Sequence, residues 1–324
     1  MRFVRDLLIM GMLLLLLLSG CGKKPDAENP ASSAESVPAV EGSSSVTGSG
    51  QAAAPDVIPI ETVSLDGFSM NYFQFGHGDK TMVILPGLSV QGVMGAASQV
   101  AEAYQPMTED FTIYVFDPRN ELPESYSIEE MAENTAAAFE ALGLDHVYLM
   151  GASMGGMAAL EIAAHHPELV EKVVLASASA QMTEEQFQTI DRWIALAKDG
   201  DAEALYLDFG EAVYPEEVFE QSREALKEAA KTVTKEELDH FVILAESMRG
   251  FDATEELELI KCPVLAISSS DDHVLGADAA AAMEAYMEQR PEWEAFTYDG
   301  YGHAAYDLAT DFKERMTEFF LKNA

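Results

Sequence analysis

Cysteine and basic side chains are scarce in this sequence. Its 324 residues include two cysteines, Cys21 and Cys262, which are too few for a disulfide framework or a cysteine-ligated metal site. The seven histidines are not spaced as a metal-binding pair on one helix face. Only 19 Lys and Arg oppose 56 Asp and Glu, so the formal net charge is −37. Because such an acidic chain repels polyanions, we do not expect nucleic acid as a partner.

The sequence also lacks an apolar run long enough to span a bilayer. The N-terminal run, residues 7–18, is shorter than the roughly 20 residues that a membrane-spanning helix needs, and Arg2 and Arg5 precede it. This pattern predicts the hydrophobic core of a secretory signal. The run ends in Leu18-Ser19-Gly20-Cys21, which resembles the lipobox of bacterial lipoproteins.

That resemblance implies that residues 1–21 are a lipoprotein signal peptide and that Cys21 is acylated as the new N-terminus. The protein would then be lipid-anchored to the cell membrane on its extracytoplasmic face, and Cys262 would have no cysteine to pair with. The alternative is an ordinary signal peptide cleaved nearby. Residues 22–55 are mostly Ser, Ala, Gly, Pro and Glu, which predicts a disordered tether to a folded domain over residues 56–324.

One stretch, residues 146–160, carries the strongest chemical signal. It reads as a short apolar strand, a serine with glycines two positions before and after it (Ser153, Gly151 and Gly155), and a helix of small residues. A tight strand-to-helix turn needs residues without Cβ at those positions, and it exposes the serine oxygen beside the positive end of the helix. A glycine-rich helix entry with an incidental N-cap serine is the alternative. The pattern resembles the nucleophile elbow of the α/β-hydrolase family.

An acid and a histidine follow Ser153 in the order that this family uses. The predicted strand 262–267 leads into Asp271 and Asp272, and the last predicted strand leads into a glycine-preceded histidine, His303. Each follows the carboxyl end of a strand, where open α/β sheets form their sites. The resemblance aligns the acid with Asp272, and Asp271 stays open as the alternative because the two carboxylates are adjacent. His303 would be the base.

The rest of the chain alternates strands and helices, which predicts right-handed crossovers and a doubly wound, mostly parallel sheet. We expect an α/β domain with eight strands, like that of the α/β-hydrolase family. A hairpin at Asp66-Gly67 would open it, and Ser127 with Glu130 would cap a helix that ends at Gly143. The other predicted strands are 59–65, 68–75, 81–85, 111–116 and 173–176, together with the strand before Ser153, 262–267 and 293–298.

From about residue 180 to 250 this alternation gives way to helical periodicity, over 183–198, 202–213, 215–231 and 234–248. A helical insertion at this place resembles the cap of the same family, which sets substrate choice. Residues 180–258 hold 21 acidic and 7 basic residues. We interpret that charge as a solvated outer face, with a barrier to anionic substrates as the alternative. Six apolar residues could line a pocket or pack the cap: Trp193, Tyr206, Phe209, Tyr214, Phe241 and Met248.

The resemblance also implies an oxyanion hole made by the backbone N–H groups of Leu88 and Met154, although Pro86 stands where the family has histidine. Asp117 is interpreted as structural. The expected function is a carboxylesterase-like serine hydrolase of small ester-like substrates that needs no metal or organic cofactor. Thioester, lactone, amide or carbon–carbon hydrolysis, perhydrolysis, and a non-catalytic lipid-tethered binding protein are the alternatives. The sequence indicates no protein partner.

Overall fold

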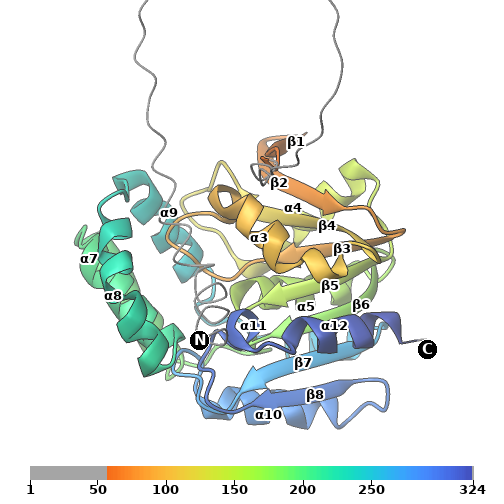
Figure 1. Cartoon of the computed structure of the whole chain (residues 1–324). Helices are drawn as coiled ribbons and strands as arrows, with labels where there is room; N and C mark the ends of the chain where they lie inside the picture. Colours follow the sequence, from red (N-terminus) through yellow and green to blue (C-terminus); the bar gives the residue numbers. More distant parts are fainter. Residues whose placement is uncertain (1–56, 323–324) are drawn as a thin grey trace, which may run out of the picture.

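The computed structural model describes residues 57–322 as a mixed sheet of eight strands with helices on both faces (Figure 1). The expected signal peptide, Cys21 and the tether lie outside the described residues. None of the helices in the described part of the chain has both the length and the hydrophobicity needed to cross a membrane. The strands lie in the order β1-β2-β4-β3-β5-β6-β7-β8, so β5 is central and its carboxyl end has neighbouring strands on both sides.

The strand bounds follow the predicted apolar segments closely. β1 and β2 form the predicted hairpin around Gly67, whose φ of 84° is a conformation that glycine adopts without strain. β2 pairs antiparallel with β4, and every later pair, from β3–β4 to β7–β8, is parallel. The strands are β1 (Glu61–Leu65), β2 (Phe68–Gly76), β3 (Lys80–Leu85), β4 (Phe111–Arg119), β5 (Val147–Ala152), β6 (Val170–Ala176), β7 (Val264–Ser269) and β8 (Glu294–Tyr298).

Helices cover both faces of the sheet, which confirms the predicted α/β class. One hydrophobic cluster lies under α4 (Ile128–Leu142), α5 (Met154–His165) and α10 (Ala277–Met287), and a second lies under α3 (Ala97–Ala103) and α12 (Phe312–Leu321). In Figure 1, α3 and α12 lie in front of the strands. A short helix, α11 (Ala305–Leu308), precedes α12.

Two helix-end predictions are confirmed. The Ser127 side chain accepts a hydrogen bond from the Glu130 N–H at 3.1 Å, and the Glu130 carboxylate accepts one from the Ser127 N–H at 3.0 Å. These reciprocal bonds satisfy two N–H groups that α4 would otherwise leave unpaired. At the other end, Gly143 adopts a left-handed conformation with φ of 70° and stops the helix.

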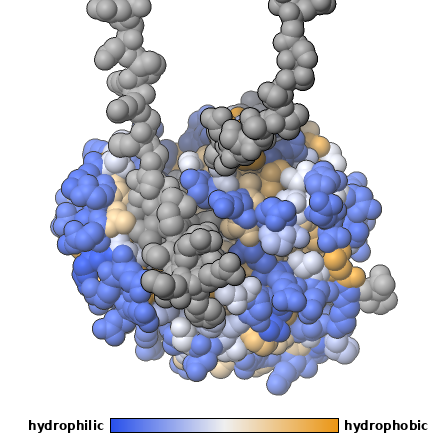
Figure 2. Space-filling model, in the orientation of Figure 1, coloured by the Kyte–Doolittle hydropathy of each residue, from blue (hydrophilic) through white to orange (hydrophobic). Residues whose placement is uncertain are grey.

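Four helices lie between β6 and β7, at the place where the helical cap is predicted. They are α6 (Phe187–Lys198), α7 (Ala202–Val213), α8 (Glu216–Ala230) and α9 (Lys235–Glu246). In Figure 1, α7, α8 and α9 stand apart from the sheet, beyond the carboxyl ends of its central strands. Their visible outer surface is mostly hydrophilic (Figure 2), as expected for a charged face in contact with water.

Hydrogen bonds join the cap to loops of the core. Gln91 accepts from the Tyr206 hydroxyl at 3.2 Å and donates to the Glu237 carboxylate at 2.9 Å, so one core side chain bridges α7 and α9. The Val213 carbonyl at the end of α7 accepts from the Ala304 N–H at 3.2 Å. Because Ala304 follows His303, the last bond ties the cap to the loop that carries the predicted base.

The structure corrects the sequence reading at three places. The strand predicted over residues 111–116 is longer in the structure: β4 continues to Arg119, which pairs with Met70 after an irregularity in the ladder. The helices α3 and α10 were not predicted, since their alanine-rich sequences have little amphipathic pattern. The C-terminal helix is divided into α11 and α12, with Ala309 in an extended conformation after the first.

Candidate active site

Ser153 lies on the turn between β5 and α5. Its backbone has φ of 50° and ψ of −119°, a conformation that residues with side chains rarely adopt. The surrounding backbone holds this turn in place: the Ser153 N–H donates to the Ala176 carbonyl at 2.8 Å, and its carbonyl accepts from Gly156 at 2.8 Å and Met157 at 3.1 Å. The side chain is buried, with the residue only 8% exposed.

Close backbone packing explains the glycines on either side of Ser153. A Cβ on Gly151 would overlap the Gly155 carbonyl, and a Cβ on Gly155 would overlap the carbonyls of Leu85 and Pro86. Gly87 is also close, because a Cβ there would lie 3.1 Å from the Ser153 Cβ. The turn therefore sits directly against the loop that follows β3.

His303 and Asp272 form a buried pair. The His303 Nδ1 lies 2.7 Å from the Asp272 Oδ2, and the two residues are 3% and 7% exposed. The other carboxylate oxygen, Oδ1, accepts from the N–H groups of Val274 at 2.8 Å and Leu275 at 2.9 Å. Burial opposes ionisation of Asp272, but the charge and hydrogen bond of His303 and the two N–H groups outweigh it, so the Asp272 pKa lies below its usual value.

Asp271, the alternative acid, has a different set of partners. Its carboxylate accepts from the Ser269 hydroxyl at 2.7 Å and from the N–H groups of Gly300 at 3.0 Å and Gly302 at 3.2 Å. It therefore ties the loop after β7 to the loop after β8 and contacts backbone beside the histidine. The geometry pairs His303 with Asp272, not with Asp271.

Ser153 and His303 line one small cavity of about 20 Å³ between the core and the cap. Leu88 lines it from the loop after β3, and Tyr306 lies edge-on to the His303 ring with the ring centroids 6.4 Å apart. Three of the six cap residues singled out from the sequence also line it: Trp193, Phe209 and Met248. The structure thus gathers the predicted nucleophile, base and one oxyanion residue at a single place.

Met154, the second oxyanion residue, is the first residue of α5 and is 2% exposed. Its backbone N–H is one of those that the helix leaves without an intrahelical partner, since the first four N–H groups of a helix have none. The positive end of the α5 dipole adds to its attraction for an anion. Leu88 and Met154 therefore come from the two loops that meet at Ser153.

Other acidic residues and histidines noted in the sequence lie away from this pair. Asp117 accepts from the Val93 N–H at 2.9 Å, and burial raises its pKa to about 6. This contact fits the structural interpretation. His273 is exposed, and His165 and His166 at the end of α5 contact glutamates. Within residues 57–322, no three His, Cys, Asp or Glu side chains converge as they would to hold a metal ion.

A larger cavity of about 130 Å³ adjoins the first, and the sequence reasoning missed most of its polar lining. Phe209 and Tyr214 of the cap were candidates, but Tyr104, Tyr306 and Asp307 were not. Tyr306 and Asp307 lie on α11, whereas His303 lies in the turn before that helix. No helical spacing therefore links these residues to His303 in the sequence.

A third cavity, of about 210 Å³, is lined by Met154 and Pro86 next to the Ser153 turn. It is more polar, with Arg119 and Asn120 from the core facing Glu237 and His240 from α9. Phe241, another of the six cap residues, lines it as well. Two larger cavities, one mainly apolar and one more polar, therefore lie near the Ser153 turn.

Comparison with known proteins points to the same fold. The sequence profile of the alpha/beta hydrolase fold matches residues 80–218. The chain is 24% identical over 209 residues to "Putative carbamate hydrolase RutD" of Caulobacter sp. (strain K31), covering 60% of this chain and 74% of that protein. It is 28% identical over 159 residues to "Serine hydrolase BPHL" of Mus musculus, covering 44% and 53%.

Among solved structures, MGS-M2, an alpha/beta hydrolase enzyme from a Medee basin deep-sea metagenome library, superimposes with a TM-score of 0.72. The match covers 82% of this chain and 98% of that protein at 22% identity. At this identity the likeness speaks for the fold alone, and it spans nearly all of the described residues. The chain therefore has the α/β-hydrolase fold.

Proposed function

We propose that this protein is a serine hydrolase that cleaves an ester or a related acyl bond through an acyl-enzyme intermediate. The observation that carries the proposal is the buried hydrogen bond between His303 and Asp272 in a histidine loop that shares a cavity with Ser153. A serine on a strained turn, a histidine and an oriented carboxylate are the parts that nucleophilic acyl transfer requires.

The hydrogen bonds support a distinct role for each group in this mechanism. Because the Asp272 carboxylate can only accept, its bond to Nδ1 holds the proton of neutral His303 on that nitrogen and leaves Nε2 free to accept one. Nε2 takes the Ser153 proton as the hydroxyl oxygen attacks the carbonyl carbon. Asp272 then stabilises the imidazolium, which returns the proton to the leaving group. Water, activated in the same way, releases the acyl group.

The negative oxygen of the tetrahedral intermediate would bind the N–H groups of Leu88 and Met154. Both belong to backbone that is buried and packed against the Ser153 turn, so these dipoles need little reorganisation as charge develops. A preorganised donor of this kind contributes about 10²- to 10³-fold to kcat.

The lining favours a substrate without negative charge. No lysine or arginine lines either the small cavity at Ser153 or the adjoining larger one. The walls are mainly apolar and aromatic, and the one carboxylate would repel an anion such as free carbamate. An ester with an apolar chain fits these walls better than the substrate in the name of the relative from Caulobacter.

Two measurements test the proposal. Short-chain 4-nitrophenyl esters should be hydrolysed, and a fluorophosphonate probe should label Ser153. Ser153→Ala should abolish both. Ser177→Ala is the matched control, because Ser177 directly follows the adjacent strand β6, is buried and also has a positive φ, of 46°. Full activity in Ser153→Ala, or equal loss in both variants, would contradict the triad.

Hydrolysis of thioesters, lactones or amides would use the same three residues. A panel of these substrates at equal concentration distinguishes the reactions by their kcat/KM values. Absence of probe labelling in a folded protein would instead favour a binding protein that has lost turnover. Altered loop residues such as Pro86 are the support for that alternative.

For the N-terminus, we propose that Cys21 is acylated and anchors the protein on the extracytoplasmic face of the cell membrane. The basic start, the apolar run over residues 7–18 and the small residues before Cys21 support this. Cells supplied with an alkyne-tagged fatty acid should label the wild type and a Cys262→Ala variant but not Cys21→Ala. Labelling of Cys21→Ala, or no labelling of the wild type, would refute it.

A further inference from the structure

The cavity of about 130 Å³ opens beside the predicted nucleophile and shares part of its wall with the Ser153 cavity. Gly87 and Leu88 from the loop after β3, Phe209 and Val213 from α7, and Tyr306 line both spaces. A group bonded to the reacting carbonyl at Ser153 can therefore extend into it without leaving the site. This position makes the cavity a candidate for substrate recognition.

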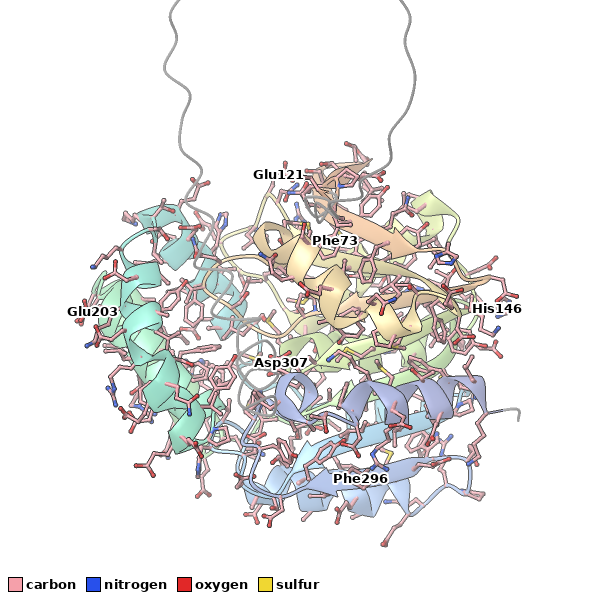
Figure 3. The ribbon with its side chains drawn as sticks, viewed as in Figure 1. Phe73, Glu121, His146, Glu203, Phe296 and Asp307 are labelled. Atoms are coloured by element: carbon pink, nitrogen blue, oxygen red, sulfur yellow. The ribbon has the colours of Figure 1, made fainter. Side chains whose placement is uncertain are left out.

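Its wall combines apolar side chains with aromatic rings and one charge. The floor is formed by apolar ends of the central strands, such as Ile84, Val115 and Met150. Four aromatic residues line it: Tyr104, Phe209, Tyr214 and Tyr306. The only charged residue in the lining is Asp307, at the side of the core that faces the cap helices (Figure 3).

Asp307 is half-buried and lines the cavity. Among residues 57–322, its side chain has no hydrogen bond and no ion pair within 4.0 Å, so the carboxylate can receive a cation from the cavity. The charged or titratable groups that face it are Lys313 on α12 and His303. Lys313 does not line the cavity; its Nζ lies 4.9 Å from the centre of the Tyr104 ring. Burial raises the Asp307 pKa to about 6, although Lys313 and His303 act to lower it.

We propose that this cavity binds a cationic group of the substrate, an ammonium or quaternary ammonium on a short apolar chain, with Asp307 as its counter-ion. A cation bound there gains the charge of Asp307 and the faces of the surrounding rings, the two features by which proteins recognise ammonium groups. It also supplies the positive partner that the carboxylate lacks. The inference rests on the proposed hydrolase function, since it names the substrate class of the same site.

Size and charge set further limits on this substrate. A cavity of about 150 Å³ holds a molecule of the size of benzene, so about 130 Å³ accommodates a trimethylammonium head, with its chain extending back toward Ser153. The acidic chain, with a formal net charge of −37, raises the local concentration of cations and speeds their association. This field gives the excess of acidic residues on the cap a second effect besides solubility.

The test compares substrates that differ only in charge. 4-Nitrophenyl 4-(trimethylammonio)butanoate and 4-nitrophenyl 5,5-dimethylhexanoate have the same shape, because carbon replaces nitrogen, and the cation does not titrate. Choline butanoate and 3,3-dimethylbutyl butanoate place the same difference in the alcohol part. In at least one pair, wild-type kcat/KM should favour the cation by about 10- to 100-fold, the range of a charge-assisted contact.

Asp307→Asn should reduce that preference at least tenfold, whereas Glu314→Gln should leave it unchanged. Glu314 is a matched control because it is acidic, nearby in sequence and exposed on α12. An equal cation preference in wild type and Asp307→Asn, or no preference in the wild type, would overturn the inference. The wild-type ratio of kcat/KM for the cationic and neutral esters tests the inference even if the Asp307 variant fails to fold.

A binding measurement separates failure of this inference from failure of the proposed function. Calorimetry with pentyltrimethylammonium on Ser153→Ala, with and without Asp307→Asn, needs no turnover. Binding that is lost with Asp307→Asn supports the cation site even in a protein that hydrolyses neither ester. Absence of binding, together with hydrolysis of only the neutral esters, would leave the hydrolase proposal intact and reject the cation site.

Discussion

The substitution Asp272→Asn tests the proposed chemistry most sharply, because the structure predicts which way the new amide must face. Oδ1 of Asp272 accepts two backbone N–H bonds, from Val274 at 2.8 Å and Leu275 at 2.9 Å. An asparagine keeps these bonds only by placing its carbonyl oxygen there. Its NH₂ group then occupies the position of Oδ2, which lies 2.7 Å from the His303 Nδ1.

That orientation reverses the tautomer of the histidine. An NH₂ group is a donor, so Nδ1 must accept and the imidazole proton moves to Nε2. An Nε2 that carries a proton cannot accept one from Ser153, and no carboxylate remains to stabilise the imidazolium. In Ser-His-Asp triads this change lowers kcat by about 10⁴-fold, which corresponds to about 5.5 kcal/mol in activation free energy.

Asp271→Asn is the matched control. An asparagine can retain the bonds that Asp271 Oδ1 accepts from Ser269 and Gly300, and it loses the bond from the Gly302 N–H. We expect kcat within about tenfold of wild type and a stability loss of about 0.5–1.5 kcal/mol. The assay is kcat and KM on a 4-nitrophenyl ester, with thermal unfolding of each variant. Asp272→Asn within tenfold of wild type, or a larger loss of kcat in Asp271→Asn, would refute the reasoning.

Two further predictions concern stability. Gly155→Ala should destabilise the protein by about 1–3 kcal/mol, because its Cβ would overlap the Leu85 carbonyl. Gly95→Ala is the control and should not destabilise it, because the space around that Cβ is open. Urea unfolding measures both variants, and equal free energies of unfolding would contradict the packing argument. Burial, and after it nearby glutamates, raise the pKa of Glu161 from 4.5 to about 7. The folded state therefore binds this proton more tightly than the unfolded state, and the protein loses stability as the pH rises from 4.5 to about 7. Glu161→Gln should therefore stabilise the protein by about 1–3 kcal/mol at pH 8 and little at pH 4; an equal gain at both values would contradict the shift.

Local signals in the sequence were sufficient for the fold class and for the order of the site residues. The capping box of Ser127 and Glu130 and the stop at Gly143 depend on residues three positions apart or on one backbone conformation, so they can be read without a tertiary structure. Gly151 and Gly155 also indicated the tight turn, because the requirement for glycine there is local. Parallel strands also bring their carboxyl ends to one edge, which is why Ser153, Asp272 and His303 could be expected together.

Longer-range features could not be read in this way. The continuation of β4 to Arg119 depends on pairing with Met70, nearly fifty positions earlier, and no local pattern marks that partner. Helices such as α3 and α10 obtain their stability from the sheet against which they pack, and their own sequences carry little sign of it.

By itself, then, the sequence determined the α/β architecture and the three strand ends from which the candidate site is built, because periodicity, glycine requirements and strand order are local or follow from topology. Only the tertiary structure decided that Asp272 faces His303 while Asp271 turns to the Gly300–Gly302 backbone, since adjacent residues differ in direction but not in sequence position. It alone also brought Asp307 and Tyr104, about two hundred residues apart, to one cavity beside Ser153. Such a cavity exists only where separate elements meet, and no single segment encodes it.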